Sequence, residues 1–161
     1  MGDVDRDRAA VYAAEDQLVA TLERSGAGAV IDFFGSPLTL PDERKFADLD
    51  SVRRYLTAVV ADPVVRDRFA GATVPQVRDR KGPHKAHYSA GVIALPVDQR
   101  WAGRETVVLH ELAHHLVAGQ AMAAHDDVFV SAYVFLVETV MGAEAGLLFR
   151  AALDGAGVRV R

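Results

Sequence analysis

The sequence predicts one α+β domain that spans residues 1–161. Apolar residues recur at three- and four-residue spacing in several segments, which is typical of amphipathic helices. Shorter segments between them are rich in β-branched and aromatic residues, which favour strands. Of the 161 residues, 50% are hydrophobic, so the chain can bury one core without disulfide bonds. We therefore expect a small, mainly antiparallel sheet packed on helices.

The first part of the chain is expected to combine helices with a short strand region. Gly35-Ser36-Pro37 breaks the strand pattern, and Asp50 or Ser51 can cap the helix that follows the next polar loop. The predicted elements are a helix over residues 6–24, a strand over 29–34 with a short continuation over 38–40, and helices over 50–61 and 63–69.

Two strands are expected before the most informative helix. Residues 74–78 and 86–95 have the composition of strands, and Gly82-Pro83 between them favours a turn. We expect these strands to form a hairpin whose second strand leads toward that helix. The rest of the chain is predicted to be helical, over residues 107–117, 126–141 and 143–153.

Charge and composition limit the classes of function. Lys and Arg number 18 and Asp and Glu 22, a formal net charge of −4, so charge gives no general reason to expect a nucleic-acid partner. The sequence contains no cysteine, which excludes thiolate metal sites and fits a reducing cytoplasm. The charged segment Met1–Arg8 is unlike a secretory signal, and no apolar run has the length of a membrane span. We expect a cytoplasmic protein without a membrane partner, and the sequence does not indicate its oligomeric state.

The segment His110-Glu111-Leu112-Ala113-His114 is an H-E-x-x-H motif. Residues four apart lie one turn above each other on the same helix face, so His110 and His114 can bind one metal ion together. Glu111 lies beside them, where its carboxylate can hold and deprotonate a water molecule. The helix is supported by a terminating Gly119 and by an apolar stripe. The stripe consists of Val108, Leu109, Leu112, Leu116 and Val117.

The motif needs a third ligand, because a catalytic zinc ion usually has three protein ligands and a fourth position for water or substrate. His125 is the best candidate, since it lies eleven residues after His114 at the start of the next predicted helix. Asp126 and Asp127 are suited to cap that helix. Glu138, 24 residues after His114, is the alternative third ligand.

The segments His110–Val117 and His125–Phe129 resemble the SprT-like branch of the zincin metallopeptidases. In that family a helix reading HELAH, followed by LV, precedes a third ligand within an H-G-x-x-F/W motif. The resemblance implies a zincin-like fold and one Zn²⁺ ion held by the three histidines, with Glu111 as the catalytic base. It covers roughly the last 60 residues. The whole chain looks most similar to small HExxH metallohydrolases whose substrates are not established.

Two features depart from the family pattern. Asp126 stands where the family has glycine, and the absence of cysteine excludes the zinc ribbon of many members. The resemblance nevertheless implies a zinc-dependent hydrolase of the metallopeptidase class that acts on a peptide or protein. The alternatives are a catalytically silent, zinc-dependent binding or regulatory module and a structural protein with a chance motif.

Three further side chains are candidate oxyanion or substrate contacts. By resemblance, the strand over 86–95 is the edge strand that precedes the metal helix, where an extended peptide can pair with its backbone. Alternation places His87 and Tyr88 on opposite faces, so at most one of them faces the cleft. Tyr133 can donate to an oxyanion, although its spacing with apolar residues favours the core. His115 points away from the ligand face of the motif and is expected to be a hydrogen-bonded flank residue.

Overall fold

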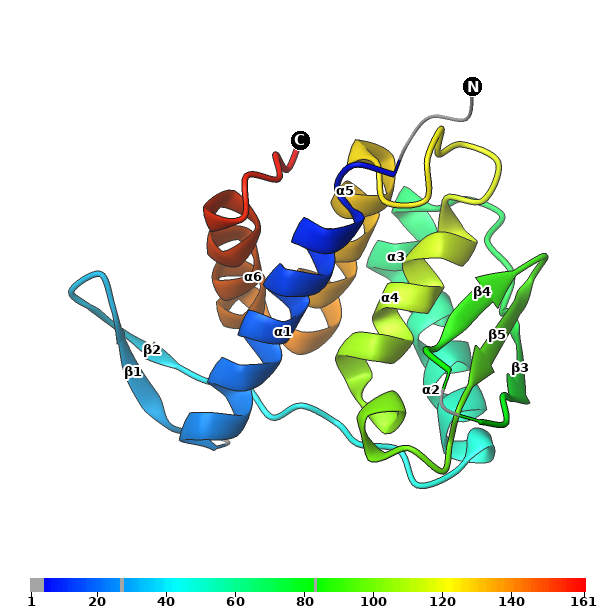
Figure 1. Ribbon diagram of the computed structural model, residues 1–161, viewed down its shortest axis with the longest axis horizontal. Helices are drawn as coiled ribbons and strands as arrows, with labels where there is room; N and C mark the ends of the chain where they lie inside the picture. Colours follow the sequence, from blue (N-terminus) through cyan, green and yellow to red (C-terminus); the bar gives the residue numbers. More distant parts are fainter. Residues whose placement is uncertain (1–4, 27, 83) are drawn as a thin grey trace. The chain divides into compact units, whose positions relative to one another are not determined.

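The computed structural model describes residues 5–26, 28–82 and 84–161. The chain forms two compact units (Figure 1): the first combines residues 1–43 with 119–161, and the second comprises residues 44–118. Each unit contains helices and a small sheet, which confirms the predicted α+β class. The single domain expected over residues 1–161 stays a prediction.

The first unit is built mainly from helices. Helix α1 (Arg8–Ser25) packs against α6 (Ala143–Gly155), and α5 (Asp127–Leu136) continues into a π-helical turn, η2 (Val137–Met141) (Figure 1). The π-helical turn breaks the regular helix that was predicted over residues 126–141. Three fully buried aromatic rings form part of this core. They are Phe129, Tyr133 and Phe149, with successive ring centroids 5.8 and 4.7 Å apart.

A β-hairpin also belongs to the first unit. Strands β1 (Val30–Phe33) and β2 (Ser36–Thr39) pair antiparallel. Between them, Phe34 and Gly35 have φ angles of 50° and 87°, and a type I′ two-residue hairpin turn requires positive values at both of these positions. The predicted strand over 29–34 and its continuation are therefore the two arms of a hairpin. Phe34 is 91% exposed at the tip.

The second unit packs helices on a three-stranded sheet, with α2 against β3 and α4 against β4. Asp48 caps α2, rather than the predicted Asp50 or Ser51, because its carboxylate accepts the amide hydrogen of Ser51 at 2.7 Å. The elements are α2 (Leu49–Ala61), α3 (Pro63–Arg68), β3 (Gln76–Asp79), β4 (His87–Ser89), β5 (Val92–Leu95), the 3-10 turn η1 (Arg100–Gly103) and α4 (Glu105–Leu116).

The strand pairing in the second unit differs from the prediction. The strand order is β3-β5-β4, with β3 parallel and β4 antiparallel to β5. The expected hairpin between residues 74–78 and 86–95 is wrong, because the segment 86–95 itself folds back at Ala90 and Gly91. These two residues have φ angles of 47° and 82°. The predicted turn at Gly82-Pro83 includes Pro83, which lies outside the described residues.

The new pairing also moves the edge of the sheet. Strand β5, which comes last before α4, is the central strand, and its residues Ile93, Ala94 and Leu95 are buried. Strand β4 contacts α4 and is one of the two edge strands of this sheet. The edge-strand role expected for residues 86–95 can therefore belong only to the short β4 arm.

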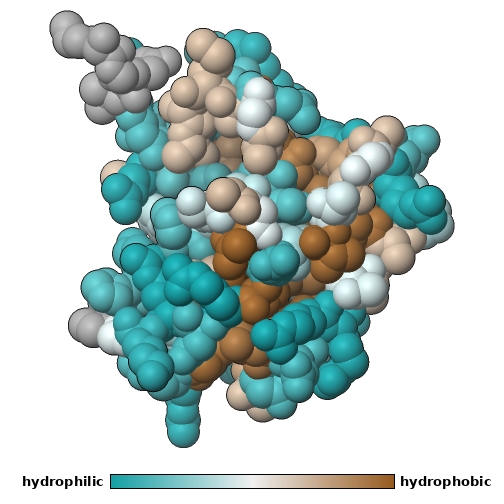
Figure 2. Space-filling model, turned by 90° about the vertical axis from the view of Figure 1, so that its right-hand side faces the viewer, coloured by the Kyte–Doolittle hydropathy of each residue, from teal (hydrophilic) through white to brown (hydrophobic). Residues whose placement is uncertain are grey.

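The described part of the chain has no helix with both the length and the apolarity of a membrane span. Figure 2 shows one face of the molecule, on which hydrophobic surface (brown) appears among hydrophilic side chains (teal). Exposed hydrophobic side chains of the second unit include Val64 at 55%, Val74 at 42% and Val97 at 40%. The surface is therefore of mixed polarity.

Candidate metal centre

Helix α4 brings together the two histidines of the H-E-x-x-H motif. The Nε2 atoms of His110 and His114 lie 3.2 Å apart, and the ring centroids lie 5.0 Å apart. Two imidazole nitrogens that each bind one tetrahedral zinc ion at about 2.0–2.1 Å lie about 3.3 Å from each other. His110 is buried and His114 is half-buried. The pair therefore has the spacing of two ligands of a single zinc ion.

Glu111 is buried as well, with 4% of its surface exposed. The surrounding positions of α4 are apolar, and Leu109, Leu112 and Ala113 are 0% exposed. Burying a carboxylate costs free energy that an apolar side chain would not cost at the same position. Packing alone therefore does not explain a glutamate at position 111.

The first turn of α4 is fixed by Glu105, which is 0% exposed. Its carboxylate accepts hydrogen bonds from the Tyr55 hydroxyl at 2.7 Å and from Arg44 Nη1 at 2.9 Å. The hydrogen bond and the negative charge of Glu105 hold the pKa of the Arg44 guanidinium above its usual value. A Cβ atom on Gly103 would lie 2.6 Å from the backbone oxygen of Phe46, so the chain approaches closely there. These contacts fix where α4, the helix of the H-E-x-x-H motif, begins.

His115 has a structural environment, as the sequence predicted. Its Nε2–H donates to the carbonyl oxygen of Thr73 at 2.8 Å, because a carbonyl can only accept. Its Nδ1 therefore accepts from the Tyr88 hydroxyl at 3.2 Å, and that hydroxyl in turn accepts from the amide of Gly91 at 3.1 Å. Tyr88 and His115 thus join β4 to α4. The Tyr88 hydroxyl is therefore hydrogen-bonded to both His115 and Gly91.

His125 lies in the first unit and is 5% exposed. Its Nδ1 is 2.6 Å from Oδ2 of Asp5. The imidazole also packs against two rings: the centroid of Tyr12 is 5.5 Å away, and that of Phe129 is 4.9 Å away in an edge-on arrangement of 80°. The ring is therefore held by a carboxylate and by two aromatic side chains. No sequence pattern singled out Asp5, because it is 120 positions from His125.

Asp126, the residue after His125, has a structural role. Its Oδ1 accepts from the amides of Val128 and Phe129, both at 3.0 Å, which caps α5 as the sequence predicted. Its Oδ2 accepts from the amides of Met122 at 2.6 Å and Ala123 at 3.3 Å. One carboxylate therefore holds the backbone on both sides of His125. Burial raises the pKa of Asp126, but the four hydrogen bonds from backbone amides outweigh burial and hold that pKa below its usual value.

The other predicted site residues have different partners. Glu138 lies in η2, and its carboxylate accepts from Nε and Nη2 of Arg150. Tyr133 is 0% exposed and donates its hydroxyl hydrogen to Glu15 at 2.5 Å, so its environment is the core of the first unit. His87 is exposed on β4. The structure therefore places Glu138 in an ion pair and Tyr133 in the core.

Comparison with family models, with curated proteins and with solved structures found no match to this chain. The likeness to SprT-like zincins thus stays a prediction that rests on the motif residues.

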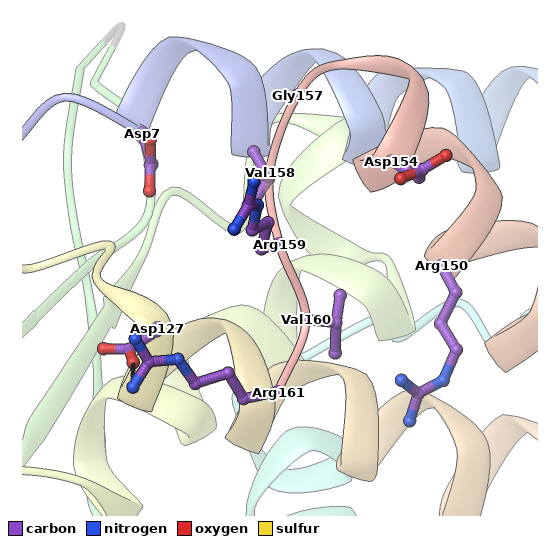
Figure 3. Close-up of a pocket in the computed structure, with 9 residues that line it drawn as sticks. All are labelled: Asp7, Asp127, Arg150, Asp154, Gly157, Val158, Arg159, Val160 and Arg161. Atoms are coloured by element: carbon purple, nitrogen blue, oxygen red, sulfur yellow. Dashed lines mark ion pairs between the residues drawn. The ribbon is translucent and has the colours of Figure 1, made fainter.

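The first unit also has an open pocket of about 700 Å³, away from the motif helix in sequence. Figure 3 shows its charged lining, in which Arg161 pairs with Asp127 at 2.9 Å. Arg150, Arg159 and Asp154 line it as well. Its described lining residues include none of the predicted ligands or the predicted base. The pocket is therefore distinct from the residues of the candidate metal centre.

Proposed function

We propose that the protein is a zinc-dependent hydrolase of the metallopeptidase class, in which His110, His114 and His125 bind one Zn²⁺ ion. The 3.2 Å separation of the His110 and His114 Nε2 atoms carries this proposal. Imidazole is a preferred ligand of zinc, and three protein ligands leave the open position that catalysis needs. His125 is the proposed third ligand, because its Nδ1 is engaged by a carboxylate in the manner common among metal-bound histidines.

Glu111 is the proposed general base. When bound, zinc lowers the pKa of water toward neutrality and polarises a substrate carbonyl. The Glu111 carboxylate takes a proton from the attacking water and delivers it to the leaving amine. Its place beside His110 on a rigid helix keeps it next to the metal ligands. The products of such a step are a carboxylic acid and an amine, and no redox cofactor is required.

Strand β4 is the proposed docking edge for an extended peptide. It lies at the edge of its sheet and contacts α4, and the Tyr88–His115 hydrogen bond ties the two elements together. A peptide that adds to this edge would make backbone hydrogen bonds beside the metal-binding helix. His87, which is exposed on the same strand, is available to contact its side chains.

Zinc content and peptide cleavage test the proposal together. We expect one zinc ion per chain by elemental analysis, and cleavage of members of an unbiased peptide library. Glu111→Gln should retain zinc but lose cleavage by at least about 100-fold, because it removes the base. Glu144→Gln, an exposed glutamate of α6, is the matched control and should retain both.

Two results would contradict this assignment. Wild-type protein that binds no zinc would reject the metal centre, and full cleavage by Glu111→Gln would reject the base. Stoichiometric zinc without any cleavage would instead support the catalytically silent binding or regulatory module.

A further inference from the structure

We propose that Asp5 is a positioning residue that orients His125 and fixes which of its ring nitrogens binds the metal. This inference rests on the proposed function, because it concerns the third ligand of that site. Asp5 lies in the segment that leads into α1 and contacts His125 within the first unit. The contact is a side-chain pair between Oδ2 and Nδ1 at 2.6 Å.

The pair determines the tautomer of His125. An ionised carboxylate can only accept hydrogen bonds, so the hydrogen lies on Nδ1 of the imidazole. A neutral imidazole carries a single N–H, and its other nitrogen is then the basic one. Asp5 therefore leaves Nε2 as the nitrogen with which His125 can bind a cation. His110 and His114 also approach each other through their Nε2 atoms.

The pair also fixes the plane of the ring. Tyr12 and Phe129 pack on the imidazole with ring centroids at 5.5 and 4.9 Å. These apolar contacts limit the ring's tilt, but they do not distinguish the ring from one flipped by 180°, since both present similar shapes. The Asp5 hydrogen bond makes this distinction, because only one orientation places Nδ1–H on the carboxylate.

The carboxylate is partly shielded from water, which strengthens the interaction. The Asp5 side chain is 25% exposed and that of His125 is 6% exposed. A hydrogen bond to an ionised acceptor in such surroundings is stronger than one between neutral groups. Loss of a carboxylate that orients a metal-bound histidine typically lowers metal affinity by about 10- to 100-fold.

The experiment measures zinc affinity of the full chain by competition with a chromophoric chelator. We expect Asp5→Ala, which removes the acceptor, to weaken zinc binding by about 10- to 100-fold. Asp5→Asn, which keeps an acceptor oxygen but removes the charge, should lie between Asp5→Ala and wild type. Asp16→Asn, an exposed aspartate of α1, is the matched control and should bind zinc as wild type does.

A second readout needs no metal. Nitrogen-15 NMR of the metal-free protein reports the tautomer of each neutral histidine, and we expect wild-type His125 to carry its hydrogen on Nδ1. Asp5→Ala should shift that population toward the Nε2–H form, which a purely structural role for Asp5 would not do. A metal-free melting temperature equal to that of wild type would show that the variant folds.

The possible outcomes separate the two proposals. If wild type binds zinc and Asp5→Ala binds it equally well with the same His125 tautomer, the positioning role is wrong and the metal centre stands. If wild type binds no zinc, the metal centre itself is wrong, and the role of Asp5 as positioning a ligand is wrong with it.

Discussion

The Tyr55 hydroxyl donates a hydrogen bond of 2.7 Å to the carboxylate of Glu105, the first residue of the helix that carries His110 and His114. Glu105 is fully buried and also accepts from the backbone amide and guanidinium of Arg44. A carboxylate in the first turn also interacts favourably with the helix dipole. Glu105 therefore links α4 to α2 and to the segment before it.

Replacing Glu105 should destabilise the fold without removing a ligand. In Glu105→Ala the Tyr55 hydroxyl and the Arg44 amide lose a charged acceptor, and we expect a loss of about 2–3 kcal/mol in the free energy of unfolding. Tyr55→Phe, which removes only one donor, should cost about 1 kcal/mol. Urea unfolding followed by circular dichroism measures both. Equal stability of Glu105→Ala and wild type would contradict the anchoring role.

Asp126 should make the free energy of unfolding depend on pH in the acidic range. Burial raises the pKa of Asp126, but the hydrogen bonds from the amides of Phe129, Met122, Ala123 and Val128 together lower it by more than burial raises it. The folded-state pKa therefore lies below the unfolded one. The stabilisation is then present above the unfolded pKa of about 3.9 and is lost as pH falls through the folded pKa. We expect the unfolding free energy of wild type to fall more steeply below about pH 4 than that of Asp126→Asn. Parallel pH profiles for the two proteins would show that this carboxylate is not the cause.

The identity of the third ligand can be tested by a pair of variants. His125→Gln should reduce zinc affinity strongly, because it removes an imidazole from the proposed set. Glu138→Gln should leave zinc affinity unchanged, since the Glu138 carboxylate is engaged by Arg150. Chelator competition on the purified full-length variants measures both effects. The reverse result, with zinc lost only in Glu138→Gln, would make Glu138 the ligand.

Tyr88 should contribute to stability and not to metal binding. In Tyr88→Phe, Nδ1 of His115 loses its donor and the Gly91 amide loses an acceptor. We expect a cost of about 1–2 kcal/mol in the free energy of unfolding, with unchanged zinc stoichiometry. Denaturant unfolding combined with elemental analysis makes the comparison. Loss of zinc without loss of stability would instead place the Tyr88 hydroxyl at the metal site.

The sequence alone determined the local parts of this arrangement. Helix geometry places residues four apart on one face, so the pairing of His110 with His114 followed from their spacing. The cap at Asp126 was predictable in the same way, because a capping side chain binds amides only two and three residues ahead. These relationships need no knowledge of the rest of the chain.

The tertiary structure decided which distant segments meet. The parallel pairing of β3 with β5, the Glu138–Arg150 ion pair and the contact of Asp5 with His125 all depend on how hydrophobic faces pack within a unit. The turn at Ala90 could not be predicted from the sequence either, since alanine rarely adopts a positive φ and gives no turn signal. Local hydrogen-bond geometry fixes spacing along a helix, whereas burial of the whole chain selects the neighbours of each side chain.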